Sequence, residues 1–299
     1  MLKQRNINIL LVITIICISL SAIFVKLSDA PSTIMVMYRM FLACALILPI
    51  VFRHRDSFAK IKRREWIAIV FAGIFLAGHF GLWFESLKHT TVASSTLILA
   101  LQPAIALIGG MIFFKEKLDM RLVLAMGIAF IGVVVVGGGS FGGGSAAFLG
   151  NVLSFLAVVS VVLYLMIGQR NVKSINHWVY SFLVFFVAGM TVAVFNLIAG
   201  ISFTGYSTND WMVFVMLAIF PTGAHIIFNL LLNYVNTTTV SMATLGEPVG
   251  ASILAVILLQ EMLTPVEMIG GVLIIVGIFY FLRLQAGSKQ AVPKESESI

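Results

Sequence analysis

Apolar segments of about 20 residues recur along the whole chain, and this recurrence restricts the possible folds more than any other feature. A helix of about 20 apolar residues crosses a hydrocarbon core roughly 30 Å thick. The 299 residues are 60% hydrophobic and 10% charged, outside the range of soluble domains. The sequence therefore predicts an all-α integral membrane protein. We expect ten transmembrane helices at 7–27, 32–52, 66–88, 91–114, 121–138, 148–168, 177–199, 211–233, 238–259 and 265–283.

The basic residues fall mainly on one side of the membrane under this assignment. The formal charge is +7, and the loops at 53–64 and 115–121 share one side with the N-terminus. The other side receives mostly the acids Asp29, Asp210, Glu261 and Glu267. This positive-inside pattern predicts a multi-pass protein of the cytoplasmic membrane with both termini in the cytoplasm. The charge thus indicates topology in a lipid environment, and we expect no nucleic-acid partner.

Two segments of the chain match each other. "LQPAIALIGGMIFFKEKL" at 101–118 aligns with "GEPVGASILAVILLQEML" at 246–263, and the offset of 145 residues also relates Gly132 to Gly277. We predict two five-helix repeats, 1–138 and 148–283, with a Gly-rich linker at 139–147 and a cytoplasmic tail at 284–299. Because five is odd, the second repeat is inverted in the membrane, an architecture common in secondary transporters. Acids Glu116 and Glu261 then lie at equivalent helix ends, where we expect capping or hinge roles.

Two longer segments carry a family resemblance. "TTVASSTLILALQPAIALIGGMIFFKEKL" and "TTVSMATLGEPVGASILAVILLQEMLTPVEMIGGVLIIVGIFYFL" resemble the paired fourth-fifth and ninth-tenth span signatures of the EamA family of the drug/metabolite transporter superfamily. The resemblance implies ten helices, cytoplasmic termini, and transport of a small metabolite such as an amino acid, nucleobase or organic cation. Small four-helix multidrug relatives carry an acid in their first span. Span one here has none, so their proton-exchange mechanism is not implied.

Glu247 is the first candidate for binding a substrate or a coupled proton. An ionised group at the bilayer centre costs on the order of 2.5–3.5 kcal/mol, so it needs a partner or a function. Pro248 disfavours helical geometry at the residue before it, and we expect a helix break at Pro103 and at Pro248. Ser241 and Thr244 place hydroxyls on the face of Glu247. A structural pairing of Glu247 with a neighbouring helix stays open.

His79 and His225 lie near the membrane centre in spans three and eight. Histidine titrates near neutral pH, so either could accept a transported proton. Hydrogen bonding across a helix interface is the alternative.

Arg39 and Glu85 lie at similar depth, and we expect a structural ion pair that could also serve as a gate. Further candidates for substrate contact are the aromatic and neutral polar residues Tyr38, Trp83, Tyr164, Gln102 and Asn229. The last two could instead join helices. Gly246 and Gly250, with Ala106 and Gly110, predict close packing of spans four and nine.

The sequence as a whole predicts a secondary transporter that moves a small metabolite by alternating access, and the resemblance favours export. Proton-coupled import of the same substrates stays open. A non-transporting receptor or lipid-binding scaffold is a rival from another class. An intramembrane hydrolase is disfavoured because "GASI" at 250–253 lacks the second glycine of a nucleophile elbow. The linker lacks the Lys-Ser/Thr ending of a phosphate loop, and we expect no enzyme activity, cofactor or metal.

Overall fold

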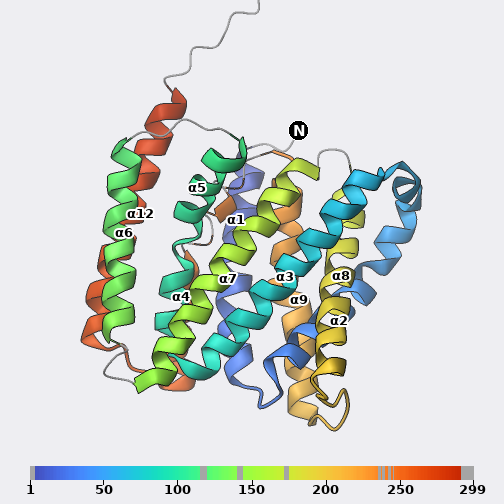
Figure 1. Ribbon diagram of the computed structural model, residues 1–299, viewed down its shortest axis with the longest axis horizontal. Helices are drawn as coiled ribbons and strands as arrows, with labels where there is room; N and C mark the ends of the chain where they lie inside the picture. Colours follow the sequence, from blue (N-terminus) through green and yellow to red (C-terminus); the bar gives the residue numbers. More distant parts are fainter. Residues whose placement is uncertain are drawn as a thin grey trace, which may run out of the picture.

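The computed structural model describes residues 4–114, 120–139, 144–171, 175–234, 237, 240, 241, 244 and 246–290, and they form a bundle of helices (Figure 1). Seven helical segments among these residues are long and apolar enough to cross a membrane, so the prediction of an all-α, multi-pass membrane protein is confirmed. The elements are α1 Gln4–Lys26, α2 Ser32–Arg53, η1 Arg55–Lys60, α3 Arg63–His89, α4 Val92–Leu99, α5 Gln102–Phe114, α6 Met120–Gly139, α7 Gly144–Asn171, α8 His177–Ile198, α9 Thr208–Leu231, α11 Gly246–Leu254, η2 Ala255–Leu259 and α12 Pro265–Gln290.

Connections between the helices lie at two opposite ends of the bundle. The N-terminus and η1 mark one end, which we call the N-terminal end (Figure 1). The α1–α2, α3–α4 and α8–α9 connections lie at the opposite end (Figure 1). α1, α2 and α3 therefore run in alternating directions, and so do α7, α8 and α9 (Figure 1), as expected of a chain that crosses a membrane repeatedly.

Helices from the two halves of the chain pack side by side. α1 packs against α9, α2 against α8, α3 against α7, and α6 against α12. α6 and α12 form a pair at one edge of the bundle (Figure 1). Glycines allow their backbones to approach closely: a Cβ added at Gly132 would lie 2.7 Å from the Gly270 carbonyl oxygen, and one at Gly277 would lie 2.5 Å from the Ala129 nitrogen.

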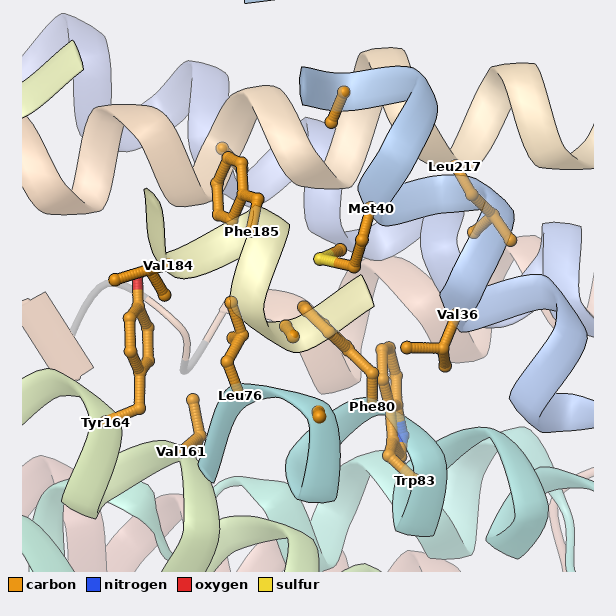
Figure 2. Close-up of a cluster of buried hydrophobic side chains, with 14 of the residues drawn as sticks. Val36, Met40, Leu76, Phe80, Trp83, Val161, Tyr164, Val184, Phe185 and Leu217 are labelled. Carbon is orange, nitrogen blue, oxygen red and sulfur yellow. The ribbon is translucent and has the colours of Figure 1, made fainter. Parts of the chain in front are cut away.

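Buried side chains of α2, α3, α7, α8 and α9 form the main core. Figure 2 shows part of it, with Phe80 and Trp83 side by side on α3 and Tyr164 of α7 beside Val184 of α8. Large apolar residues also cover the outside of the bundle, for example Ile131 and Ile269 on α6 and α12. A lipid-facing surface of this kind needs no water-soluble coat.

The predicted spans 91–114 and 238–259 are not single helices, so the expectation of ten continuous helices is wrong at these two places. α4 ends at Leu99 and α5 begins at Gln102, with Pro103 in its first turn. α11 likewise begins at Gly246 with Pro248 in its first turn. Proline lacks a backbone donor and disfavours helical geometry before it, but it is tolerated in a first turn. Each proline therefore lies at the start of a new helix instead of kinking a continuous one.

Two helices and one contact differ from the expected spans. α7 begins at Gly144 and not at 148, and α12 extends to Gln290 and does not end at 283. The Gly246/Gly250 pair faces α1 and not span four: added Cβ atoms would meet Ile15 Cγ2 at 2.7 Å and Ser19 Oγ at 2.3 Å. α11 also contacts α4.

Candidate functional site

A small polar cavity lies between the two halves of the bundle. Its volume is about 20 Å³, enough for roughly one water molecule. Six of the predicted candidates, Glu247, His79, His225, Gln102, Trp83 and Thr244, line it together with Arg39. The remaining lining residues are Ile18, Ser21, Phe80, Leu99, Val161, Leu165, Pro221 and Phe228.

Arg39 of α2 is fully buried beside this cavity and is held on two sides. Its Nε donates a 2.8 Å hydrogen bond to Thr222 Oγ1 of α9. Its guanidinium carbon lies 3.7 Å from the centre of the Phe80 ring, a cation–π contact that also fixes the plane of the group. Neither Nη1 nor Nη2 has a hydrogen-bond partner within the described part of the chain. Among the described residues, the outer edge of the guanidinium is therefore free.

The Thr222 hydroxyl that accepts from Arg39 is oriented by a break in the hydrogen bonding of α9 at Pro221. Pro221 has no backbone N–H, so the Leu217 carbonyl one turn earlier lacks its helical donor. The Thr222 hydroxyl takes that place and donates to Leu217 O at 2.9 Å. In membrane helices, hydroxyl side chains commonly repair such breaks. One hydroxyl thus closes the gap in α9 and orients Arg39.

His79 and His225 lie close together in the cavity wall, with ring centres 6.3 Å apart. His79 Nδ1 is 2.9 Å from the Ala157 carbonyl oxygen. Because a carbonyl only accepts, Nδ1 carries the hydrogen, and Nε2 of the neutral ring is an acceptor. The Nδ1 atom of His225 is buried without a partner among the described residues.

Unpartnered polar atoms are concentrated in this cavity. Nine buried side-chain nitrogen or oxygen atoms of the described residues lack a hydrogen-bond partner, and five of them belong to the lining residues Ser21, Arg39, Trp83 and His225. Leaving such a group unpaired in an apolar interior costs free energy. Their convergence indicates a site suited to a polar ligand with several acceptor atoms.

Glu247 contributes the opposite charge to the same cavity. It lies in the first turn of α11 and is 6% exposed. Its carboxylate takes part in neither of the two ion pairs found among the described residues, Lys26–Glu261 and Glu85–His89. Gln102, in the first turn of α5, donates to Ser241 Oγ at 3.1 Å and so connects the start of α5 to the segment that precedes α11. Both broken helices therefore begin at the cavity.

The other predicted contact residues lie outside the cavity wall. Tyr38 donates to the Phe203 carbonyl oxygen at 2.6 Å and stacks on Phe214, toward the opposite end. Tyr164 donates to Asn229 Oδ1 at 2.6 Å, and Asn229 donates to Ser181 Oγ at 3.0 Å. Ser241 accepts from Gln102. These hydrogen bonds join α2 to the α8–α9 connection, α7 to α9, α9 to α8, and α5 to the segment before α11.

The predicted ion pair between Arg39 and Glu85 is wrong. Glu85 is half exposed and contacts His89 Nε2 at 3.2 Å, one turn along the same helix. His79 and Trp83 share the cavity face of α3 because they are four residues apart. Glu85 is two residues beyond Trp83, about 200° around the helix. Arg39 lines the cavity and Glu85 does not, so similar depth in the membrane did not bring the two charged side chains together.

Three contributors to the site were not singled out from the sequence: Ser21, Phe80 and Thr222. Ser21 and Phe80 are typical of many positions in apolar spans, and no local signal marks them. The Pro221–Thr222 step was a usable signal, since a proline within a span requires a substitute donor for the carbonyl that it leaves free.

The opposite end of the bundle is tied together by charged and polar groups. Lys26 Nζ lies 3.3 Å from Glu261 Oε1, and Glu261 Oε2 accepts from the Val92 backbone nitrogen at 2.8 Å. Thr91 also donates to Glu267 of α12. Glu261, in the connection between η2 and α12, therefore caps the start of α4. Its predicted counterpart Glu116 lies outside the described residues.

A wider cleft lies at the N-terminal end, between α3, α5 and α7. Its volume is about 420 Å³, and its lining includes Arg64, Phe75, Phe113, Met166 and Arg170. Met166 adjoins Leu165, which lines the central cavity. α7 therefore lines both the cleft and the cavity.

The chain is similar to a transporter family and to proteins named as uncharacterized transporters. The EamA-like transporter family matches the chain twice, over residues 5–138 and 148–283. The uncharacterized transporter YetK of Bacillus subtilis is 26% identical over 81% of this chain and 75% of its own length. The uncharacterized transporter YxxF of the same organism is 23% identical over 65% of this chain, and the match spans 63% of YxxF.

Two further similarities concern a single half and the fold. A probable 4-amino-4-deoxy-L-arabinose-phosphoundecaprenol flippase subunit, ArnE of Hamiltonella defensa, is 27% identical over 36% of this chain and 96% of its own length. One solved crystal structure of a protein is 18% identical and superposes with a TM-score of 0.70 over 97% of this chain and 100% of that one. At this identity the likeness shows a shared fold.

Proposed function

Because the chain belongs to the EamA-like transporter family, we propose that it is a secondary transporter whose small-metabolite substrate binds in the central cavity. The observation that carries this proposal is the convergence of unpartnered polar atoms from Ser21, Arg39, Trp83 and His225 on that cavity. A binding site of this type is mostly apolar with a few polar groups that orient the ligand.

The proposed architecture is two inverted five-helix repeats. In such a repeat, α1, α2 and α3 correspond to α7, α8 and α9. The contact of α1 with α9 then corresponds to that of α7 with α3, and the contact of α2 with α9 to that of α8 with α3. All four contacts are present. Gly132 faces Gly270 and Ile274, while Gly277 faces Ala125 and Ala129. The same 145-residue offset relates the two sets, as expected across a twofold axis. The double family match supports the same division.

Alternating access is the proposed mechanism. A 20 Å³ cavity is too small for a metabolite, so binding requires the halves to move apart. The charged contacts of Lys26 and Glu261 would open to admit solute from the opposite end, and the cleft beside Arg64 and Arg170 would extend to the cavity from the N-terminal end. Broken helices at a central site are a recurring feature of secondary transporters that work this way.

The substrate classes and coupling remain those that the sequence suggested. We propose an amino acid, nucleobase or organic cation as substrate and export across the cytoplasmic membrane, with both termini in the cytoplasm. Glu247, His79 and His225 are the candidates for binding substrate or a coupled proton, and Gln102, Thr244 and Trp83 for orienting the substrate. All six line the cavity.

A thermal-shift screen tests this function. Purified protein in detergent is incubated with amino acids, nucleobases, sugars, polyamines and quaternary amines. A ligand that binds only the folded state stabilises it by about 2.7 kcal/mol at 100 times its dissociation constant. We expect a stabilising class, and counterflow of that solute in liposomes. Ser21→Phe, which fills the cavity, should abolish both, whereas Ser202→Phe in an exposed loop should not. Absence of binding and counterflow for every class would refute the proposal.

A further inference from the structure

We propose that the ligand of the central cavity carries a carboxylate and that Arg39 binds this carboxylate through the free outer edge of its guanidinium. The inference rests on the proposed function, because it assumes that the cavity binds a solute. It adds the chemical class of the ligand and a residue, Arg39, that selects for that class, and family membership supplies neither.

The first support is how Arg39 is held. The Nε bond to Thr222 uses one edge of the guanidinium, and Phe80 covers one face. Nη1 and Nη2 remain, both buried and both without a partner in the described residues. An immobilised guanidinium binds planar anions well, because its parallel N–H groups match the two oxygens of a carboxylate. The group is fixed before any ligand arrives, which lowers the entropic cost of binding.

The second support is the hydrogen-bonding character of the neighbouring atoms. Trp83 Nε1 can only donate, and the Ser21 hydroxyl can donate. With the two Nη atoms, four of the five unpartnered atoms that the lining residues contribute among the described residues can donate, and His225 Nδ1 is the fifth. A carboxylate offers acceptor positions only, so it satisfies such a set better than an amine, which brings donors. A quaternary amine without a carboxylate would leave all of these donors unpaired.

The third support is charge balance inside the membrane. Arg39 and Glu247 line one cavity and offset each other's charge. A carboxylate bound to Arg39 needs a compensating positive charge, since an uncompensated buried ion is costly. Glu247 can provide for this in two ways, by binding an ammonium group of the same ligand or by taking up a proton. Both keep the cavity neutral, and both give a reason for an acid at this position.

The test compares each amino acid with the amine that lacks its carboxylate and with the acid that lacks its ammonium group. Three series serve as probes: L-leucine, 3-methylbutan-1-amine and 4-methylpentanoate; L-phenylalanine, 2-phenylethylamine and 3-phenylpropanoate; and L-alanine, ethylamine and propanoate. Adenine, spermidine and choline represent the other classes. Melting temperatures and dissociation constants are measured on the native protein, and counterflow is measured in liposomes. We expect members with a carboxylate to bind and the corresponding amines to bind at least about tenfold more weakly.

Arg39→Lys keeps the charge but removes the planar two-donor edge. It should weaken binding of the carboxylate ligand at least about tenfold. Arg53→Lys, the same change at the exposed end of the same helix, should have no effect. The matched series on native protein tests the proposal even where Arg39→Lys does not fold.

Each outcome has a distinct meaning. A preference for the ammonium and carboxylate together identifies Glu247 as the ammonium site, and equal binding of the free acid identifies it as a proton site. Binding of choline, spermidine or adenine with equal affinity in native protein and Arg39→Lys would refute the carboxylate assignment while leaving the transporter function intact. Absence of binding by every class would refute the proposed function itself, and the carboxylate assignment with it.

Discussion

Thr222→Val tests the interpretation of the Pro221–Thr222 step most sharply. Valine keeps the shape of threonine but removes the hydroxyl, which accepts from Arg39 Nε at 2.8 Å and donates to Leu217 O at 2.9 Å. A hydrogen bond to a charged group contributes about 1.5–3 kcal/mol. Hydrogen bonds within membrane proteins average about 0.6 kcal/mol. We therefore expect the free energy of unfolding to fall by roughly 2–4 kcal/mol.

Thr191→Val is the matched control. The Thr191 hydroxyl also donates to a backbone carbonyl, Val187 O at 2.8 Å, but that carbonyl keeps its helical N–H donor. The expected loss is about 0.5 kcal/mol or less. Pro221→Ala added to Thr222→Val should recover the part due to the Leu217 carbonyl and not the part due to Arg39.

The measurement is reversible unfolding in mixed micelles, followed by circular dichroism. Thr222→Ser should behave like the native protein because it keeps both hydrogen bonds. A loss for Thr222→Val no larger than that for Thr191→Val would refute the claim that this hydroxyl supports both α9 and Arg39.

Three other predictions concern different parts of the molecule. Gly277→Ala places a Cβ 2.5 Å from a backbone nitrogen of α6, so it should lower the free energy of unfolding by about 1–3 kcal/mol. Gly127→Ala, where an added Cβ meets open space, should not lower it. Equal melting temperatures of the two variants would contradict this packing. Glu247→Gln should abolish the pH dependence of counterflow while preserving the fold, and an unchanged pH profile would exclude it as the proton site. Lys26→Ala breaks the ion pair with Glu261 at the opposite end and should speed amide hydrogen exchange in the α3–α4 connection. Lys88→Ala removes only a hydrogen bond to the Ala30 carbonyl and should speed it less. Equal exchange rates in the two variants would argue against a closing contact there.

Much of the fold could be predicted because membrane insertion imposes strong rules. Apolar length sets the spans, and proline marks where a helix cannot continue, as Pro103 and Pro248 show. The sequence did not reveal that each proline starts a new helix, since that depends on the segments packed around the break. Gly246 and Gly250 predicted a close helix contact but not its partner, because a small residue permits an approach without selecting the helix that makes it.

The sequence indicated the depth of the candidate residues in the membrane but not the direction in which their side chains point. Glu247, His79 and His225 were placed near the membrane centre by counting residues, and all three line the cavity. Depth alone also suggested the Arg39–Glu85 pair, which fails because the two side chains face different ways. In a helix that is apolar all round, the pattern hardly reports which side faces the protein. The partners of Arg39 therefore had to come from the three-dimensional arrangement.

Labelling of a cysteine in the cavity from the two sides of the membrane tests the central claim most directly. Ser21→Cys, in a Cys17→Ser, Cys44→Ser background, is reconstituted in liposomes and exposed to a membrane-impermeant thiol reagent from outside or inside. The account predicts labelling from both sides and protection by a bound ligand, while Ser181→Cys, buried behind the cavity wall, stays unlabelled. Labelling of Ser21→Cys from one side only, or from neither, would contradict a central site reached alternately from the two ends.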